Sequence, residues 1–231
     1  MAGPSGDLPL RPREMRDRNR ALVLDAVVRS EPVTRAQLAA RTGLTKSSVS
    51  SIVQELRSAG LVVEQGAQRG GDLGRPGTAL TLARDGLAGL GLEVNVDYLA
   101  AWATDLAGVL HHRAFVASDN RAQSPEEVIG ELAHLSVGAL AQPFAETRTP
   151  LSACVAVPGL VDSHGGLVVA PNLGWADVPV ADLLREALED PSFELCVENE
   201  ANLGAVAELV EGAGRGLRDF VYVSGEIGIG A

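Results

Sequence analysis

The sequence predicts two domains, an N-terminal winged helix-turn-helix (mainly α-helical with a β-hairpin wing) and an α/β lobe of the actin-like, ribonuclease-H-like type. Three observations lead to this expectation. Residues 16–85 carry three helical patterns followed by two strand patterns. Residues 86–231 open with three strand-like runs, a helix and another strand. The charge balance also changes sign between these two segments.

The change of charge separates the segments chemically. Residues 1–85 hold 13 Arg and Lys against 9 Asp and Glu, whereas residues 86–231 hold 6 against 21. An acidic domain repels polyanions, so any contact with nucleic acid is expected in the first segment. A domain boundary is therefore predicted near residue 85, and residues 1–15 are expected to form a flexible N-terminus.

The first segment contains the signals of a helix-turn-helix. An amphipathic helix over residues 15–30 is expected to end before Pro32. Thr34 and Gln37 have the spacing of a capping box, which predicts a short second helix. Gly43 suits the sharp turn that follows, because glycine tolerates a positive φ.

A third helix is predicted from Lys46 to Leu56, with Thr45 as its cap. Its apolar residues share one face, and its other face carries short or forked polar groups that can reach bases and phosphates in a major groove. A solvated helix face would show the same pattern, so this helix alone does not decide the function. The predicted DNA-contacting residues here are Arg35, Thr45, Lys46, Ser47, Ser48, Ser51 and Gln54.

Two strands, residues 61–65 and 78–82, are expected to form an antiparallel hairpin. The glycine-rich loop between them carries Arg69 and Arg75, and an arginine at such a tip can enter a narrow minor groove. A plain flexible hairpin is the alternative. The order of helices and hairpin is that of a winged helix, which predicts binding to a double-stranded DNA operator.

The second segment is expected to alternate strands and helices. The predicted elements are strands at 90–96, 98–105, 109–116 and 151–157, a helix at 124–140, a hairpin at 158–169, a polar loop at 170–175, a helix at 180–189, a strand at 193–197, a helix ending near 211 and a strand at 219–224.

Four motifs in this segment carry a family resemblance. They are Pro158-Gly159-Leu160-Val161-Asp162, the loop from Ala170 to Trp175, Glu198-Asn199-Glu200-Ala201-Asn202, and the closing Gly228-Ile229-Gly230-Ala231. Together they resemble the ROK family of repressors, open reading frames and sugar kinases, from about residue 16 to the end. The resemblance implies a sugar or sugar-phosphate effector held between two actin-like lobes.

The resemblance also implies site residues. Asn199 looks like the family's ligand for a sugar hydroxyl, and Asn172 looks like a further residue of the sugar cleft. Glu200 stands where the family's kinases have a catalytic aspartate. Amides and carboxylates suit sugars, because each can satisfy two hydroxyls. The alternative is that Asn199 and Glu200 only cap the next helix, and both roles can coexist.

The motif for nucleotide phosphates departs from the family. Its kinases have Asp-x-Gly-Gly-Thr after the first strand, whereas this chain has Glu93-Val94-Asn95-Val96-Asp97. Side chains at Asn95 and Val96 would stand where phosphate oxygens approach, and Asp97 would repel them. We therefore expect no enzyme activity and no catalytic residue. The alternative is a sugar kinase with an appended DNA-binding domain.

The family's zinc-binding cysteine cluster lies beyond a loop like residues 225–231, so we expect no metal, no cofactor and a largely missing second lobe. Cys154 and Cys196 are expected to be buried free thiols of a cytoplasmic protein, and a disulfide is the alternative. No apolar run could span a bilayer, so no membrane partner is expected.

The expected function is that of a sequence-specific transcriptional regulator, in particular a repressor, of carbohydrate-metabolism genes. Its second domain is expected to sense a sugar. A palindromic operator has two half-sites, each of which binds its own DNA-binding domain, and this predicts a homodimer.

Overall fold

The computed structural model describes residues 11–68, 77–140, 148–225 and 227–230. The chain divides into two compact units, Met1–Arg84 and Asp85–Ala231. The division falls where the charge of the sequence changes sign. Among the described residues, no helix combines the length and the apolar character that crossing a membrane requires.

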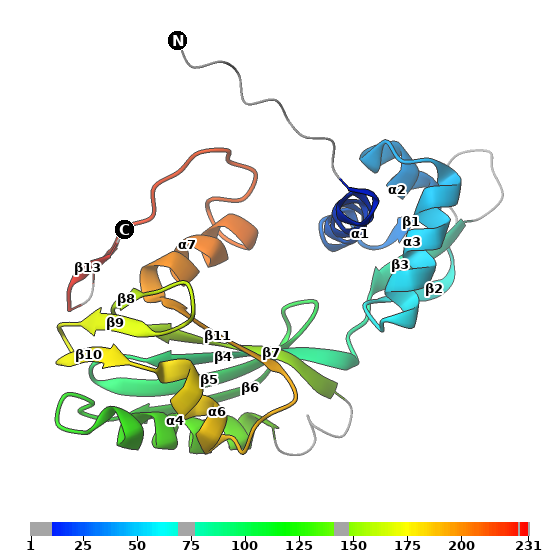
Figure 1. The fold of residues 1–231 in the computed structure, drawn as a ribbon. Helices are drawn as coiled ribbons and strands as arrows, with labels where there is room; N and C mark the ends of the chain where they lie inside the picture. Colours follow the sequence, from blue (N-terminus) through cyan, green and yellow to red (C-terminus); the bar gives the residue numbers. More distant parts are fainter. Residues whose placement is uncertain (1–10, 69–76, 141–147, 226, 231) are drawn as a thin grey trace, which may run out of the picture. The chain divides into compact units, whose positions relative to one another are not determined.

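The first unit is a winged helix-turn-helix (Figure 1). Its strands form an antiparallel sheet in the order β1-β3-β2, and β2 and β3 are the predicted hairpin. The short strand β1 was not predicted; it forms because Val33, which is buried, pairs with Leu80 of β3. The elements are α1 (Pro12–Val28), β1 (Val33–Thr34), α2 (Arg35–Thr42), α3 (Lys46–Ser58), β2 (Val62–Gln68) and β3 (Gly77–Leu82).

The helix α1 begins at Pro12, three residues before the predicted start, so residues 12–15 are helical rather than flexible. Proline suits a first helical turn, where its missing N–H needs no partner. The Glu14 carboxylate accepts a hydrogen bond of 2.8 Å from the backbone N–H of Arg11, which closes the same turn. Residues 1–10 of the predicted N-terminus lie outside the described residues.

The caps and the turn of the helix-turn-helix are confirmed. The Thr34 hydroxyl accepts from the N–H of Gln37 at 3.3 Å, and the Gln37 side chain accepts from the N–H of Thr34 at 2.8 Å. Gly43 follows α2 with φ +70°, a left-handed conformation that few other residues adopt without strain. The predicted apolar face of α3 is buried; it consists of Val49, Ile52, Val53 and Leu56.

The second unit is built on a five-stranded sheet in the order β11-β7-β4-β5-β6 (Figure 1). The strands β4, β5 and β6 are antiparallel, whereas β7 and β11 run parallel to β4. The helices α4 and α6 cover one face of this sheet and complete its apolar core. The elements are β4 (Gly86–Val94), β5 (Tyr98–Asp105), β6 (Leu110–Ala117), α4 (Pro125–Leu140), β7 (Arg148–Val157), β8 (Leu160–Val161), β9 (Leu167–Ala170), β10 (Trp175–Val178), α6 (Val180–Ala187), β11 (Glu194–Asn199), α7 (Glu200–Val210), β12 (Ser224–Gly225) and β13 (Ile229–Gly230).

Two predictions about the second unit are wrong. The strand expected over residues 219–224 is absent apart from Ser224, because no described strand lies beside it to accept its hydrogen bonds; Val221 is 83% exposed. The loop expected over residues 170–175 ends one residue early, since Trp175 begins β10 and packs into the core.

The cysteine prediction is correct in one part only. Both cysteines are free, but Cys154 is half-buried and Cys196 is exposed. Side chains alternate between the two faces of a strand. Leu195 and Val197 pack against the core, which leaves Cys196 on the opposite face of β11.

A buried carboxylate closes the turn between β5 and β6. The Asp105 carboxylate accepts from the N–H groups of Ala107 and Val109 at 2.9 and 3.0 Å, and His111 Nε2 lies 3.0 Å from its other oxygen. Burial raises the pKa of Asp105, but hydrogen bonds from His111 and the two N–H groups outweigh burial and hold this pKa below its ordinary value.

The lowered pKa of Asp105 predicts a pH-dependent stability for the second unit. A carboxyl whose pKa is lower in the folded state stabilises the protein fully above its unfolded pKa, about 3.9, and loses this effect as the pH falls further. Asp105→Asn is expected to cost about 2 kcal/mol at neutral pH, and its difference from the parent should shrink in acid. Trp102 and Trp175 both lie in this unit, so tryptophan fluorescence during urea unfolding measures it. Equal pH profiles for parent and variant would contradict the role of this carboxylate.

Candidate nucleic-acid interface and sugar site

The helix α3 presents most of the predicted DNA-contacting side chains to solvent. Lys46 is the only lysine of the chain, and none of the residues that the structure describes forms an ion pair with it. Ser48 is half-buried. The exposed members of the predicted set on this helix and its cap are Thr45, Lys46, Ser47, Ser51 and Gln54.

Three hydroxyl groups gather at the N-terminus of α3. The Thr45 hydroxyl lies 2.9 Å from those of Ser47 and Ser48, and it accepts a hydrogen bond of 3.1 Å from the N–H of Ser48. A helix N-terminus carries a partial positive charge, to which Lys46 adds a full one. This end of α3 can therefore bind a phosphate oxygen of a DNA backbone.

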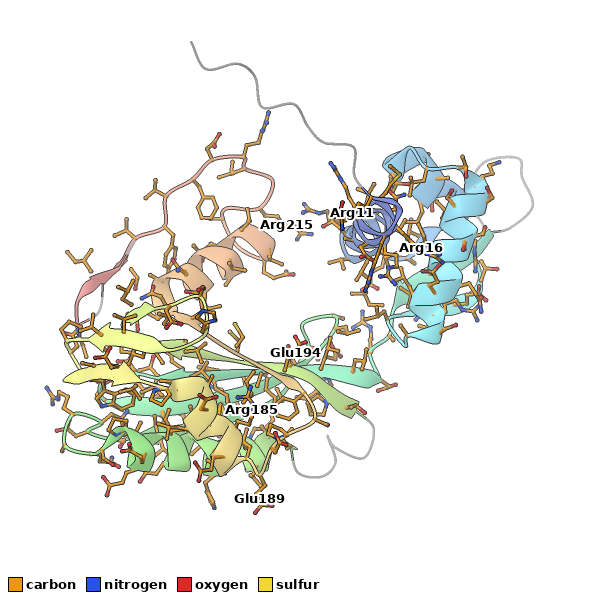
Figure 2. All side chains as sticks on the ribbon, in the orientation of Figure 1. Arg11, Arg16, Arg185, Glu189, Glu194 and Arg215 are labelled. Atoms are coloured by element: carbon orange, nitrogen blue, oxygen red, sulfur yellow. The ribbon has the colours of Figure 1, made fainter. Side chains whose placement is uncertain are left out.

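Arginines beside α3 are already paired with carboxylates. Arg35 contacts Glu64 at 2.6 Å and Arg57 contacts it at 3.3 Å; the hydrogen bond from Arg35 holds the pKa of Glu64 below its ordinary value. Arg16, which extends from α1 (Figure 2), pairs in the same way with Glu55 of α3. Arg35, one of the predicted DNA-contacting residues, is thus joined by an ion pair to the wing strand β2.

Arg57 is not among the DNA-contacting residues predicted from the sequence. Its guanidinium lies 3.4 Å from the side-chain oxygen of Gln54, one helical turn earlier on the same face. Both residues, with Val63 and Glu64, line a shallow groove between α3 and β2. Arg57 follows Gln54 by three residues, a spacing that places both side chains on one face of a helix. This spacing could have indicated Arg57 from the sequence. Arg69 and Arg75 of the predicted set lie outside the described residues.

Asn199, the first predicted sugar residue, joins two strands and a helix. Its side-chain oxygen accepts from the N–H groups of Ala201 and Asn202 at 2.9 and 3.2 Å, which caps α7. Its side-chain amide donates to the carbonyl oxygen of Gly159 at 2.8 Å. The helix cap that the sequence left open as an alternative is therefore present, and it orients the amide rigidly.

Asn172 and the start of α7 both lie beside the last described segment. A Cβ atom added to Gly228 would lie 3.2 Å from the side-chain nitrogen of Asn172, and one added to Gly230 would lie 2.7 Å from Cβ of Ala201. Glu200 is the half-buried first residue of α7. The residues 228–230 thus connect the loop that carries Asn172 with the helix that begins at Glu200.

The turn after β4 is closed by its own groups. Asn95 is 3% exposed; its side-chain oxygen accepts from the N–H of Val96 at 2.6 Å, and its own N–H donates to the carbonyl oxygen of Tyr98 at 3.0 Å. The amide of Asn120 donates to the Asn95 carbonyl oxygen at 2.7 Å. The N–H groups of Asn95 and Val96 are therefore engaged within the protein.

The described residues contain no group of three or more His, Cys, Asp or Glu side chains placed to hold a metal ion.

Two family profiles match the chain. Residues 90–231 match the ROK family, and residues 17–71 match the MarR family. A crystal structure of a ROK family transcriptional regulator, described as a homologue of the Escherichia coli MLC protein, superposes with a TM-score of 0.67 at 21% identity, over 85% of this chain and 49% of that one. This similarity shows the fold.

Curated relatives include repressors and a kinase. The xylose repressor of Bacillus spizizenii is 32% identical over 92% of this chain and 54% of its own length. The DNA-binding transcriptional repressor Mlc of Escherichia coli is 23% identical over 94% and 53%. A glucokinase of Halalkalibacterium halodurans is 34% identical over 32% of this chain and 22% of its own. The chain spans about half the length of the repressors it matches.

The contacts of Asn199 predict a graded effect on stability. Asn199→Ala removes the helix cap and the partner of the Gly159 carbonyl, which is expected to cost about 2 kcal/mol. Asn199→Asp keeps the capping oxygen and adds a charge that suits a helix N-terminus, but its second oxygen faces the Gly159 carbonyl without a proton, so an intermediate loss of about 1 kcal/mol is expected. Asn172→Ala, at an exposed position, should change the stability by less than about 0.5 kcal/mol. Urea unfolding followed by tryptophan fluorescence measures all three, and equal losses for the two Asn199 variants would contradict the double role.

Proposed function

This chain belongs to the ROK family, and we propose that it is a DNA-binding transcriptional repressor of carbohydrate-metabolism genes. In this proposal the first unit binds a double-stranded operator as part of a homodimer. The second unit senses a sugar or sugar phosphate without phosphorylating it, and neither unit requires a cofactor.

The observation that carries the DNA-binding role is the exposed polar face of α3 with Lys46 at its N-terminus. A helix in this position of a winged helix-turn-helix enters the major groove, and its first turn contacts bases and phosphates. The acidic second segment would be repelled by the same DNA. The names of the repressors that match more than nine-tenths of this chain agree with the proposal.

The closed turn after β4 supports a sensing role rather than a kinase role. A phosphate needs free N–H groups or cations around its oxygens. The N–H groups of Asn95 and Val96 already have partners inside the protein, and the exposed Asp97 carboxylate adds a negative charge beside them. Glu200 differs from the aspartate of the family's kinases by one methylene group, which displaces its carboxylate.

The proposed surface predicts a specific loss of DNA affinity. After selection of a bound duplex from a random pool, Lys46→Ala should bind it more weakly and reduce the slope of log affinity against log salt by about 0.9, which is the value for one lost phosphate contact. Arg75→Ala should also weaken binding. Arg215→Ala removes an exposed charge from the second unit (Figure 2) and is the matched control, expected to bind as the parent does.

The single lysine allows a direct check on the complex. An amine-reactive reagent can label only Lys46 and the N-terminal amine. Bound duplex is expected to slow labelling of Lys46. If Lys46→Ala and Arg75→Ala both bind as the parent does and labelling is equally fast with and without DNA, the assigned surface is wrong.

The second prediction separates sensing from catalysis. With a panel of hexoses and ATP, a coupled assay of ADP release should show no turnover above the rate without protein. Turnover that disappears in Glu200→Gln would overturn the non-enzymatic proposal and favour a kinase with an appended DNA-binding domain, the activity named for the glucokinase relative.

A further inference from the structure

The chain's only two cysteines, 42 positions apart in the sequence, are direct neighbours in the fold. Cys154 of β7 and Cys196 of β11 are paired in register in the parallel sheet. Paired residues of adjacent strands point to the same face. Both thiols therefore lie on the face opposite the core, Cys154 half-buried and Cys196 exposed.

The geometry of this pair fits a covalent bond. Adjacent strands lie about 4.8 Å apart, and disulfides join Cα atoms about 4.4 to 6.8 Å apart. We propose that Cys154 and Cys196 form a dithiol site that closes to a disulfide by exchange with a low-molecular-weight disulfide.

The surroundings of the two sulfur atoms indicate which thiol reacts first with the small disulfide. Burial, and then the hydrogen-bonding contact with the Cys196 thiol, raise the pKa of Cys154 to about 12, so Cys154 is a poor first nucleophile. The exposed Cys196 loses its proton and attacks one sulfur of the incoming disulfide. This step forms a mixed disulfide and releases one small thiol.

Once Cys196 is in the mixed disulfide, its thiol no longer raises the pKa of Cys154, and Cys154 is held in register beside the sulfur it attacks. Cys154 then loses its proton and attacks the Cys196 sulfur, which releases the second small thiol. The two protein thiols together lose two protons and two electrons, and the small disulfide gains both. No oxidant other than the small disulfide is needed.

The bond would act close to the candidate sugar site. The strand β11 lies at the edge of the sheet and has β7 as its neighbour. Three residues after Cys196 it ends at Asn199, whose amide binds the Gly159 carbonyl just beyond β7. A disulfide would hold these two strand ends together covalently, so the redox state of the pair would set how freely Asn199 and α7 move.

The native chain treated with glutathione disulfide, followed by alkylation and intact mass, tests the proposal. The parent is expected to lose two hydrogen atoms, to carry neither glutathione nor alkyl group, and to yield a peptide joining Cys154 to Cys196. Cys154→Ser should stop at one glutathione on Cys196, because no second thiol remains. A parent that stops at the mixed disulfide, or keeps both thiols under these conditions, overturns the proposal.

A variant in which the thiol of β11 is moved two residues along the strand is the matched control for the distance between the two cysteines. Glu194 begins β11 (Figure 2) and faces the same side as Cys196, two residues away, so its Cα lies about 8 Å from that of Cys154, beyond the reach of a disulfide. The double variant Glu194→Cys/Cys196→Ser is expected to stop at the mixed disulfide. If it closes as fast as the parent, chain mobility rather than strand register explains closure, and the proposal fails.

Discussion

The parallel pairing of β4, β7 and β11 is the constraint on which the second unit depends. Parallel strands end at the same edge of a sheet, so the segments that follow them gather there whatever their separation in the sequence. The register places Glu93 of β4 and Glu198 of β11 on either side of Ala156. The closed turn at Asn95, the Gly159 carbonyl and the Asn199 cap follow directly from these positions. The candidate sugar residue Asn199 and the closed turn after β4 thus depend on one arrangement of strand ends.

The two units divide opposite electrostatic tasks between them. In the first unit, several arginines neutralise carboxylates of the same unit, as Arg35 and Arg57 do at Glu64. Lys46, beside the N-terminus of α3, keeps its charge unpaired among the described residues. The second unit is strongly acidic and would be repelled by a polyanion. The proposed DNA-binding role therefore assigns the contacts with the polyanion to the first unit alone.

Local signals in the sequence predicted most of the fold. The capping box of Thr34, the cap at Thr45, the turn at Gly43 and the buried face of α3 each depend on residues within one or two helical turns. Alternation of apolar residues likewise located most strands of the sheet.

Features set by strand register could not be predicted in this way. The strand β1 exists only because Val33 meets Leu80, and Arg57 meets Glu64 only through the packing of α3 on β2. The apolar run around Cys196 gave no sign of which side chains face the core. The same limit explains the wrong strand at residues 219–224, whose apolar pattern lacks a neighbouring strand among the described residues. For the candidate sites, the sequence proposed Asn199 and Lys46, but the structure alone shows what holds Asn199 in place.

The close approach at Gly230 has a consequence for sequence variation. The space beside this residue is smaller than a methyl group, because a Cβ atom would lie 2.7 Å from that of Ala201. Any side chain at this position, polar or apolar, would therefore force Ala201 at the start of α7 or the backbone of residues 228–230 to shift. The size of the residue, not its polarity, is the constraint.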